Sequence, residues 1–222
     1  QEILELVNEF KEGCHEISQQ GYASPRNLDA IAGLGERLAI CILAGAINTS
    51  GLDAAGIEAT QLIVTDDNFM NADPDLQATT VNTRRTLDPL LEEKVIPVVT
   101  GFIAANREHV PTTLGRGGSD YSAAILAAAL GAIETWIWTD VDGVMTADPR
   151  LVPEARTIPV LSYDEVEEMA SLGAKVLHPK TIQPILAAGG TLRVRNTFNP
   201  GHPGTLLVER SDNLPPQKNP VK

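Results

Sequence analysis

The segment 112–130, TTLGRGGSDYSAAILAAAL, is the most informative part of the chain. Its three glycines indicate a tight turn, and the alanine- and leucine-rich run after Ser119 strongly favours a helix. A glycine-rich turn that opens a helix exposes backbone N–H groups, and the helix dipole makes that position favourable for anions. Arg116 adds a planar fork that can bind a carboxylate or phosphate through two hydrogen bonds. The segment therefore predicts an anion-binding loop; the alternative is a plain N-cap at Ser119 beside a surface Arg and Asp.

Around this segment, helical patterns alternate with apolar, β-branched runs. This alternation predicts an α/β fold, a three-layer αβα sandwich around a mainly parallel sheet. Ligands of such sheets bind beyond the carboxyl ends of the strands, and Gly101, Arg116 and Thr139 all follow predicted strands. We expect strands at 59–64, 95–100, 132–139, 192–195 and 205–208, and helices at 2–18, 27–47, 79–93, 119–130, 162–171 and 179–188.

The charge balance excludes some classes of partner. The 222 residues carry 17 Lys and Arg against 29 Asp and Glu, a net charge of −12, which argues against nucleic acid and anionic membrane. No uninterrupted apolar stretch reaches the ~18 residues that span a bilayer. The two cysteines and four histidines show no metal-ligand spacing, so we predict no protein-held metal. An anionic substrate would have to be bound by locally placed cations.

Three further motifs carry candidate chemistry. WTDVDGVMTADPR (138–150) places two turn-forming dipeptides after a predicted strand, GAKVLHP (173–179) places a lysine in a tight turn before a proline-started helix, and GER (35–37) interrupts an apolar helix with charge. Each has an ordinary alternative: a plain turn, a solvated lysine, and an exposed Glu–Arg salt bridge. An unpaired buried Glu36 would be costly, so it must face solvent, a partner or a ligand.

Together with GFI (101–103) and TTLGRGGSDYS, these strings resemble the aspartokinases of the amino acid kinase superfamily. The resemblance implies ATP-dependent phosphorylation of the L-aspartate side-chain carboxylate to 4-phospho-L-aspartate, the first step towards lysine, threonine and methionine. Donor and acceptor are both anions, so such a site needs cations, Mg²⁺ and backbone N–H groups, and an already ionised carboxylate needs no general base. The resemblance further implies ATP as cosubstrate, with Mg²⁺ held mainly by the ATP phosphates.

The resemblance also assigns roles. Met145 stands where many aspartokinases have Tyr, although a methionine can also pack on a purine. The implied catalytic residue is Asp120; the substrate contacts are Glu36, Phe102, Arg116 and Ser119; the nucleotide contacts are Thr139, Asp140, Met145, Arg150, Lys175 and Val176.

The expected organisation is one catalytic domain over 1–209, with 210–222 as a linker towards a regulatory ACT region outside these residues. The family's N-terminal Lys-Phe-Gly-Gly-Thr-Ser loop is also outside them, so this chain alone is expected to be weakly active or inactive. Two alternatives stay open: a related kinase acting on glutamate, N-acetylglutamate or UMP, and a silent nucleotide- or amino-acid-binding subunit. We expect a cytoplasmic homo-oligomer, or a plastid one if a transit peptide precedes these residues.

Overall fold

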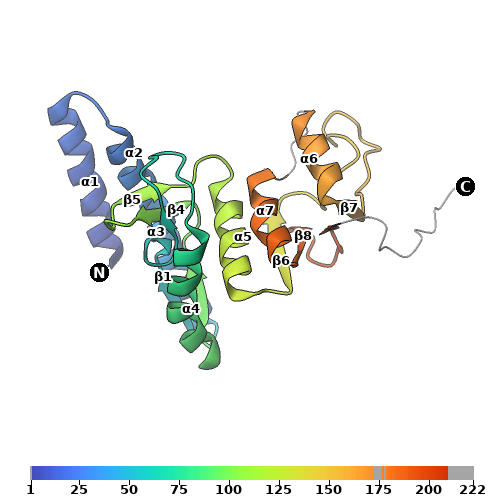
Figure 1. Cartoon of the computed structure of the whole chain (residues 1–222), viewed down its shortest axis with the longest axis horizontal. Helices are drawn as coiled ribbons and strands as arrows, with labels where there is room; N and C mark the ends of the chain where they lie inside the picture. Colours follow the sequence, from blue (N-terminus) through green and yellow to red (C-terminus); the bar gives the residue numbers. More distant parts are fainter. Residues whose placement is uncertain (1, 173–176, 178, 210–222) are drawn as a thin grey trace, which may run out of the picture. The chain divides into compact units, whose positions relative to one another are not determined.

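The computed structural model describes residues 2–172, 177 and 179–209, which form two compact units that meet in sequence between Leu130 and Gly131 (Figure 1). Each unit has its own helices and strands. Unit 1 contains α1 (Glu2–Gln20), α2 (Pro25–Ala32), α3 (Leu34–Thr49), β1 (Ala54–Ile57), the 3₁₀ turn η1 (Ala59–Gln61), β2 (Val64–Thr65), α4 (Leu76–Glu92), β3 (Ile96–Val99), β4 (Ile103–Asn106), β5 (Pro111–Thr113) and α5 (Gly118–Leu130).

Unit 1 is layered, with helices on both faces of its strands. β1 runs parallel to β3, and successive side chains of β3 point to opposite faces. Val98 packs against Ile40 and Ala44 of α3, whereas Val99 packs into a second core that includes Leu87 of α4 and residues of α5. α3 contacts β1 and β3, and α4 contacts β3. Unit 1 thus has the helix–strand–helix layering that the sequence predicts.

The strand predicted at 59–64 is wrong. The residues that pair with β3 are those of β1, with Ile57 opposite Val99. The backbone N–H of Ala59 then donates to Thr100 Oγ1 (2.7 Å), which ends the pairing and begins η1. Leu62 and Ile63 are fully buried all the same, because a turn can bury an apolar pair as completely as a strand does. Only Val64–Thr65 returns to strand form, parallel to β4.

The β4–β5 hairpin was also missed. β4 and β5 pair antiparallel, with Ile103 opposite Thr113. No strand is predicted over 103–113 from the sequence, because the Ala-Ala core of β4 has low strand propensity. All four residues of β4 are buried, so tertiary packing and not propensity fixes this strand.

By length and composition alone, one helical stretch, Pro25–Thr49, could cross a membrane. Core helices of soluble proteins pass the same test. Gly33 divides the stretch into α2 and α3, and Arg37 is tied to Glu9 of α1 and Glu58 of the loop after β1. These ion pairs attach the apolar helix to the rest of unit 1.

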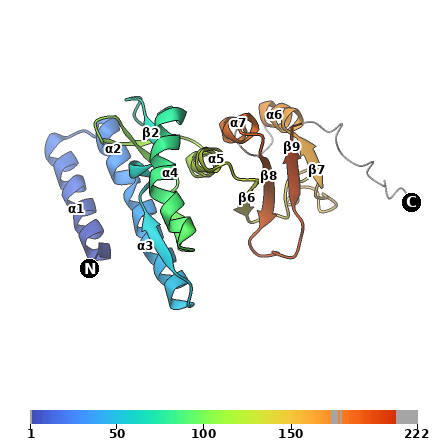
Figure 2. The same cartoon turned by 60° about the horizontal axis from the view of Figure 1, so that its bottom comes forward.

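Unit 2 is a four-stranded sheet in the order β6-β8-β9-β7. The pairs β6–β8 and β7–β9 are parallel, and β8–β9 is antiparallel. Residues such as Leu192 of β8 and Ile185 of α7 are buried, and α6 and α7 lie side by side in both views (Figures 1 and 2). The elements are β6 (Glu134–Thr139), β7 (Val160–Ser162), α6 (Tyr163–Ser171), α7 (Pro179–Ala187), β8 (Thr191–Asn196) and β9 (Thr205–Val208).

Candidate active site

One buried carboxylate fixes the segments that carry the predicted substrate contacts of unit 1. Asp29 of α2 is 2% exposed. Its carboxylate accepts hydrogen bonds from Met70 N (2.8 Å), Thr113 N (3.1 Å) and Thr113 Oγ1 (2.7 Å). A buried carboxylate with three donors is well satisfied, so it joins α2 to β5. Arg116 follows β5 by three residues, and Glu36 lies in the first turn of α3, directly after α2.

The turn at Phe102 is strained and tightly held. Phe102 has a φ of 66°, which a bulky residue rarely adopts. Its N–H donates to Ser122 Oγ (2.9 Å), and its carbonyl accepts from Leu114 N (2.9 Å). A Cβ added to Gly118 would lie 2.7 Å from Phe102 Cδ2, so only glycine permits this approach. Backbone strain held from several sides is a common property of functional sites.

Four predicted residues of unit 1 present polar groups without partners. Glu36, Arg116, Ser119 and Asp120 make no side-chain hydrogen bond or ion pair with any other residue that the structure describes. Arg116 and Ser119 are exposed, whereas Glu36 and Asp120 are half-buried. Unpaired carboxylates, a guanidinium and a hydroxyl are suited to binding a ligand that carries both charges, and Arg116, Ser119 and Asp120 belong to the segment that packs on the strained Phe102 turn through Gly118.

The alternative for the GER motif, a salt bridge between Glu36 and Arg37, is not what forms. Arg37 instead donates to Glu58 Oε1 and Glu9 Oε1, each at 2.7 Å. Burial opposes the charge of Arg37, but these two carboxylates outweigh it and raise its pKa. Arg37 therefore has a structural role, and Glu36 stays available.

Asp120 has the electrostatics of a functional residue. It lies in the first turn of α5, and desolvation raises the pKa of its carboxyl above the usual value. No described residue supplies a compensating cation or donor. A desolvated carboxylate without a partner costs folding free energy, which is typical of sites selected for function.

The loop after β6 in unit 2 is organised by Asp142. Its Oδ1 accepts from Asn196 Nδ2 (2.8 Å) and Asn199 Nδ2 (3.0 Å), and these hydrogen bonds, that of Asn196 foremost, hold the pKa of Asp142 below its usual value. Gly143 follows with a φ of 115°, and a Cβ there would lie 2.5 Å from Thr205 Oγ1. The loop is therefore held against the end of β8, the residues that follow it, and β9.

The predicted nucleotide contacts of this loop are already engaged within unit 2. Thr139 Oγ1 donates to Asp140 Oδ1 (3.2 Å). Arg150 donates to both carboxylate oxygens of Asp148, at 3.0 and 2.8 Å, and its side chain is 74% exposed. Arg150 is thus a surface cation whose charge is neutralised by Asp148. To bind a phosphate, its side chain would have to leave Asp148 or contact both groups at once.

Met145 lies in an antiparallel bridge with Thr157, whose hydroxyl lies 3.4 Å from the methionine sulfur. The predicted contacts Lys175 and Val176, and the predicted linker 210–222, lie outside the described residues. The substrate-side and nucleotide-side candidates belong to units 1 and 2 respectively. Among the described residues, no group of three or more His, Cys, Asp or Glu side chains is placed to hold a metal ion.

Sequence reasoning missed the residues that shape these loops. Asp29 lies within the predicted helix 27–47, Ser122 within the segment 112–130 and Asp142 within the motif 138–150, and the sequence predicts no role for any of the three. Their hydrogen-bond partners lie 84, 20 and 54 residues away in sequence. A carboxylate within an apolar run was the one available signal, for Asp29, because burial would oblige it to find partners.

Comparison with known proteins identifies the family. The amino acid kinase family model matches residues 4–196. The chain belongs to the amino acid kinase family. It is 36% identical over 213 residues to Aspartokinase 1, chloroplastic, of Arabidopsis thaliana, covering 95% of this chain and 37% of that protein. It is 37% identical over 212 residues to the aspartokinase of Rickettsia prowazekii (strain Madrid E), covering 95% and 46%.

A solved structure extends this likeness to the fold. E. coli aspartokinase III in complex with aspartate and ADP aligns with a TM-score of 0.89 at 34% identity, over 96% of this chain and 47% of that one. The predicted α/β amino acid kinase fold is therefore confirmed. This amino acid kinase chain spans less than half the length of these three relatives.

Proposed function

We propose that this chain is the catalytic part of an aspartokinase, which transfers the γ-phosphoryl group of ATP to the side-chain carboxylate of L-aspartate. The observation that carries the proposal is the set of unpartnered polar groups in the first turn of α3 and in the segment that packs on the strained Phe102 turn, in a chain whose relatives are aspartokinases. Glu36 is suited to the substrate ammonium and Arg116 to a substrate carboxylate. The likeness to a structure that holds aspartate and ADP supports the same substrates.

Phe102 and Ser119 would line the substrate pocket, and Asp120 would orient the reacting groups. On the nucleotide side, Thr139, Asp140, Met145, Arg150, Lys175 and Val176 remain the proposed contacts. Magnesium would arrive as MgATP, with the metal held chiefly by the phosphates, because the reacting oxygens are all anionic and need its charge. Residues 1–209 would form one catalytic domain made of both units.

Oligomeric state and compartment belong to the proposal as well. The apolar side chains of Ile42 and Leu43 on α3 are 63% and 53% exposed, which supports a homo-oligomer. The relatives include bacterial and chloroplastic proteins, and the cytoplasm is our proposal for this chain.

A coupled ADP-release assay tests the function. This chain and an upstream-extended version would each be assayed with aspartate, glutamate, N-acetylglutamate and UMP, in Mg²⁺ and in EDTA. We expect Mg²⁺-dependent turnover with aspartate alone, at least in the extended version. Turnover with another acceptor would identify a different kinase of this fold, and ATP binding without turnover in either version would identify a silent binding subunit.

A further inference from the structure

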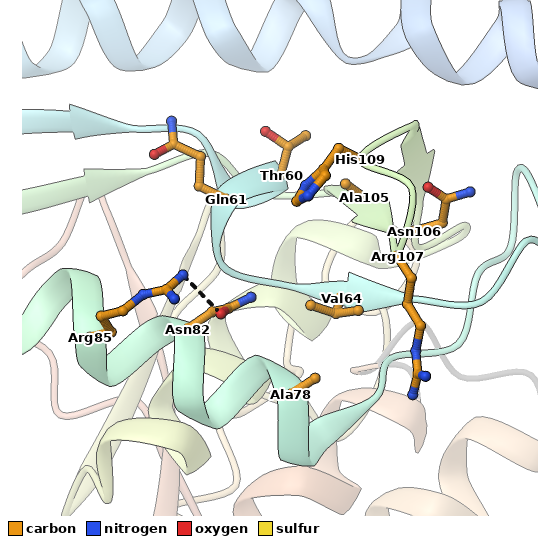
Figure 3. Close-up of a pocket in the computed structure, with 10 residues that line it drawn as sticks. All are labelled: Thr60, Gln61, Val64, Ala78, Asn82, Arg85, Ala105, Asn106, Arg107 and His109. Atoms are coloured by element: carbon orange, nitrogen blue, oxygen red, sulfur yellow. Dashed lines mark hydrogen bonds between the residues drawn. The ribbon is translucent and has the colours of Figure 1, made fainter.

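Unit 1 contains a pocket of about 650 Å³ that is separate from the candidate active site (Figure 3). Its size falls within the range of ordinary small-molecule sites. None of Glu36, Phe102, Arg116, Ser119 or Asp120 lines it. The lining residues come from η1, β2, α4 and the β4–β5 hairpin: Thr60, Gln61, Val64, Ala78, Asn82, Arg85, Ala105, Asn106, Arg107 and His109.

The lining of this pocket is cationic although the chain is acidic. It has two arginines and a histidine and no Asp or Glu, against a net charge of −12 for the whole sequence. Arg107 is committed to Asp75, at 2.9 Å. Arg85 has one partner among the described residues, the side-chain oxygen of Asn82 at 3.1 Å. Most of the five N–H donors of Arg85 are therefore unused.

Helix periodicity assembles one wall of the pocket. Ala78, Asn82 and Arg85 are four and three residues apart on α4 and so share a face. Figure 3 shows Arg85 and Asn82 side by side on α4, joined by their hydrogen bond, and Gln61 on the neighbouring turn η1. The wall offers a guanidinium with neutral amide groups nearby, and Ala78 gives it an apolar part.

The opposite rim is rigid. Asn106 is 7% exposed, and its side chain accepts from the backbone N–H groups of Glu108 (3.1 Å) and Val110 (2.8 Å) while donating to Asp67 (2.6 Å). These bonds hold the hairpin turn in which His109 has a φ of 61°. The imidazole is therefore presented by a fixed backbone and not by a loose loop.

We propose that this pocket binds a small organic anion through a carboxylate or phosphate group on Arg85. Asn82 and Gln61 would hydrogen-bond its polar atoms, and His109 would contact it from the rim. A guanidinium with open donors binds either anion through two hydrogen bonds. The proposal is independent of the proposed catalytic function.

NMR titration of the full chain tests the site. Succinate and inorganic phosphate, used separately, represent the two anion classes, and the His109 ring protons and the Asn82 and Gln61 side-chain amides are the reporters. We expect saturable shifts with at least one anion. Arg85→Gln should weaken that binding at least about tenfold, as expected when a charged hydrogen-bonding group is lost.

Two variants keep the result interpretable. Lys11→Gln removes the same charge from exposed α1 and should leave the affinity unchanged. Arg116→Gln should also leave it unchanged, which separates this site from the candidate active site. The proposal is overturned if neither anion gives saturable shifts up to about 50 mM, or if folded Arg85→Gln binds as well as the parent chain.

Discussion

Two loops of the molecule are rich in Gly, Asp and Arg: one leads into α5 in unit 1, and the other follows β6 in unit 2. They differ in whether their charged side chains have partners within the chain. In unit 1, Arg116 and Asp120 have no partner among the described residues, and burial raises the pKa of Asp120. In unit 2, Asp142 is held by Asn196 and Asn199, and Arg150 by Asp148.

This difference separates two ways of building a binding loop. The unit 1 loop is held by buried hydrogen bonds of Asp29 and of the Phe102 turn, which do not use its exposed side chains. Those side chains remain available to a ligand. The unit 2 loop is fixed by its own side chains, which are consequently less available to a ligand. Loss of Arg116 from the first loop should therefore change substrate affinity, whereas substitution of Gly143, where the second loop packs on Thr205, should change stability.

The largest expected effect is that of Arg116→Ala on aspartate turnover. If Arg116 binds a substrate carboxylate, its loss should lower kcat/KM for aspartate about 10²–10³-fold, or about 3–4 kcal/mol, with ATP affinity nearly unchanged. Steady-state kinetics and calorimetry with ATP measure both. Arg26→Ala, an exposed arginine on α2, is the control; an unchanged kcat/KM in Arg116→Ala would remove this residue from the site.

Gly143→Ala should have the next largest effect, and on stability. The new Cβ would meet the Thr205 hydroxyl and its backbone nitrogen, at 2.5 and 2.8 Å, in a backbone region that alanine rarely adopts. We expect a loss of about 3 kcal/mol in the free energy of unfolding, measured by urea denaturation. Gly201→Ala in the same unit, where nothing lies within 4 Å, should cost little. Equal stability of the two variants would show that the unit 2 loop is not pinned.

The contrast between the loops could be predicted only in part from sequence. The layered α/β fold follows from alternating periodicities, and Arg116 follows from charge placed beside a glycine turn, whereas the roles predicted for Glu36 and Asp120 come from the resemblance to aspartokinases. Which of these groups are left unpaired depends on contacts between distant segments, such as that of Asp29 with Thr113. Contacts between distant segments also determine that residues 54–57, and not 59–64, form the strand beside β3.

Arg150→Gln should have a smaller effect, because Arg150 is exposed and already paired with Asp148. An exposed ion pair contributes about 0–1 kcal/mol, so stability should barely change. The KM for ATP should rise less than about tenfold, since a shared arginine offers a phosphate only part of its charge. A rise as large as the aspartate effect of Arg116→Ala would mean that Arg150 leaves Asp148 when nucleotide binds, and that the two loops differ less than their unliganded contacts indicate.

Asp120→Asn should have the smallest effect on stability. The sign of that effect shows whether the Asp120 carboxylate has a stabilising partner in the folded chain. Because the folded-state pKa of Asp120 is raised, the folded chain retains a proton that the unfolded chain releases. Stability therefore falls as pH rises from the ordinary aspartate pKa through the raised one. The asparagine variant lacks this loss, so its Tm should match that of the parent near about pH 3 and exceed it at neutral pH. Asp164→Asn, in the exposed first turn of α6, should show no such gain. A lower Tm for Asp120→Asn at neutral pH would mean that the carboxylate has a stabilising cationic partner in the folded chain, and the contrast between the two loops would then fail at Asp120.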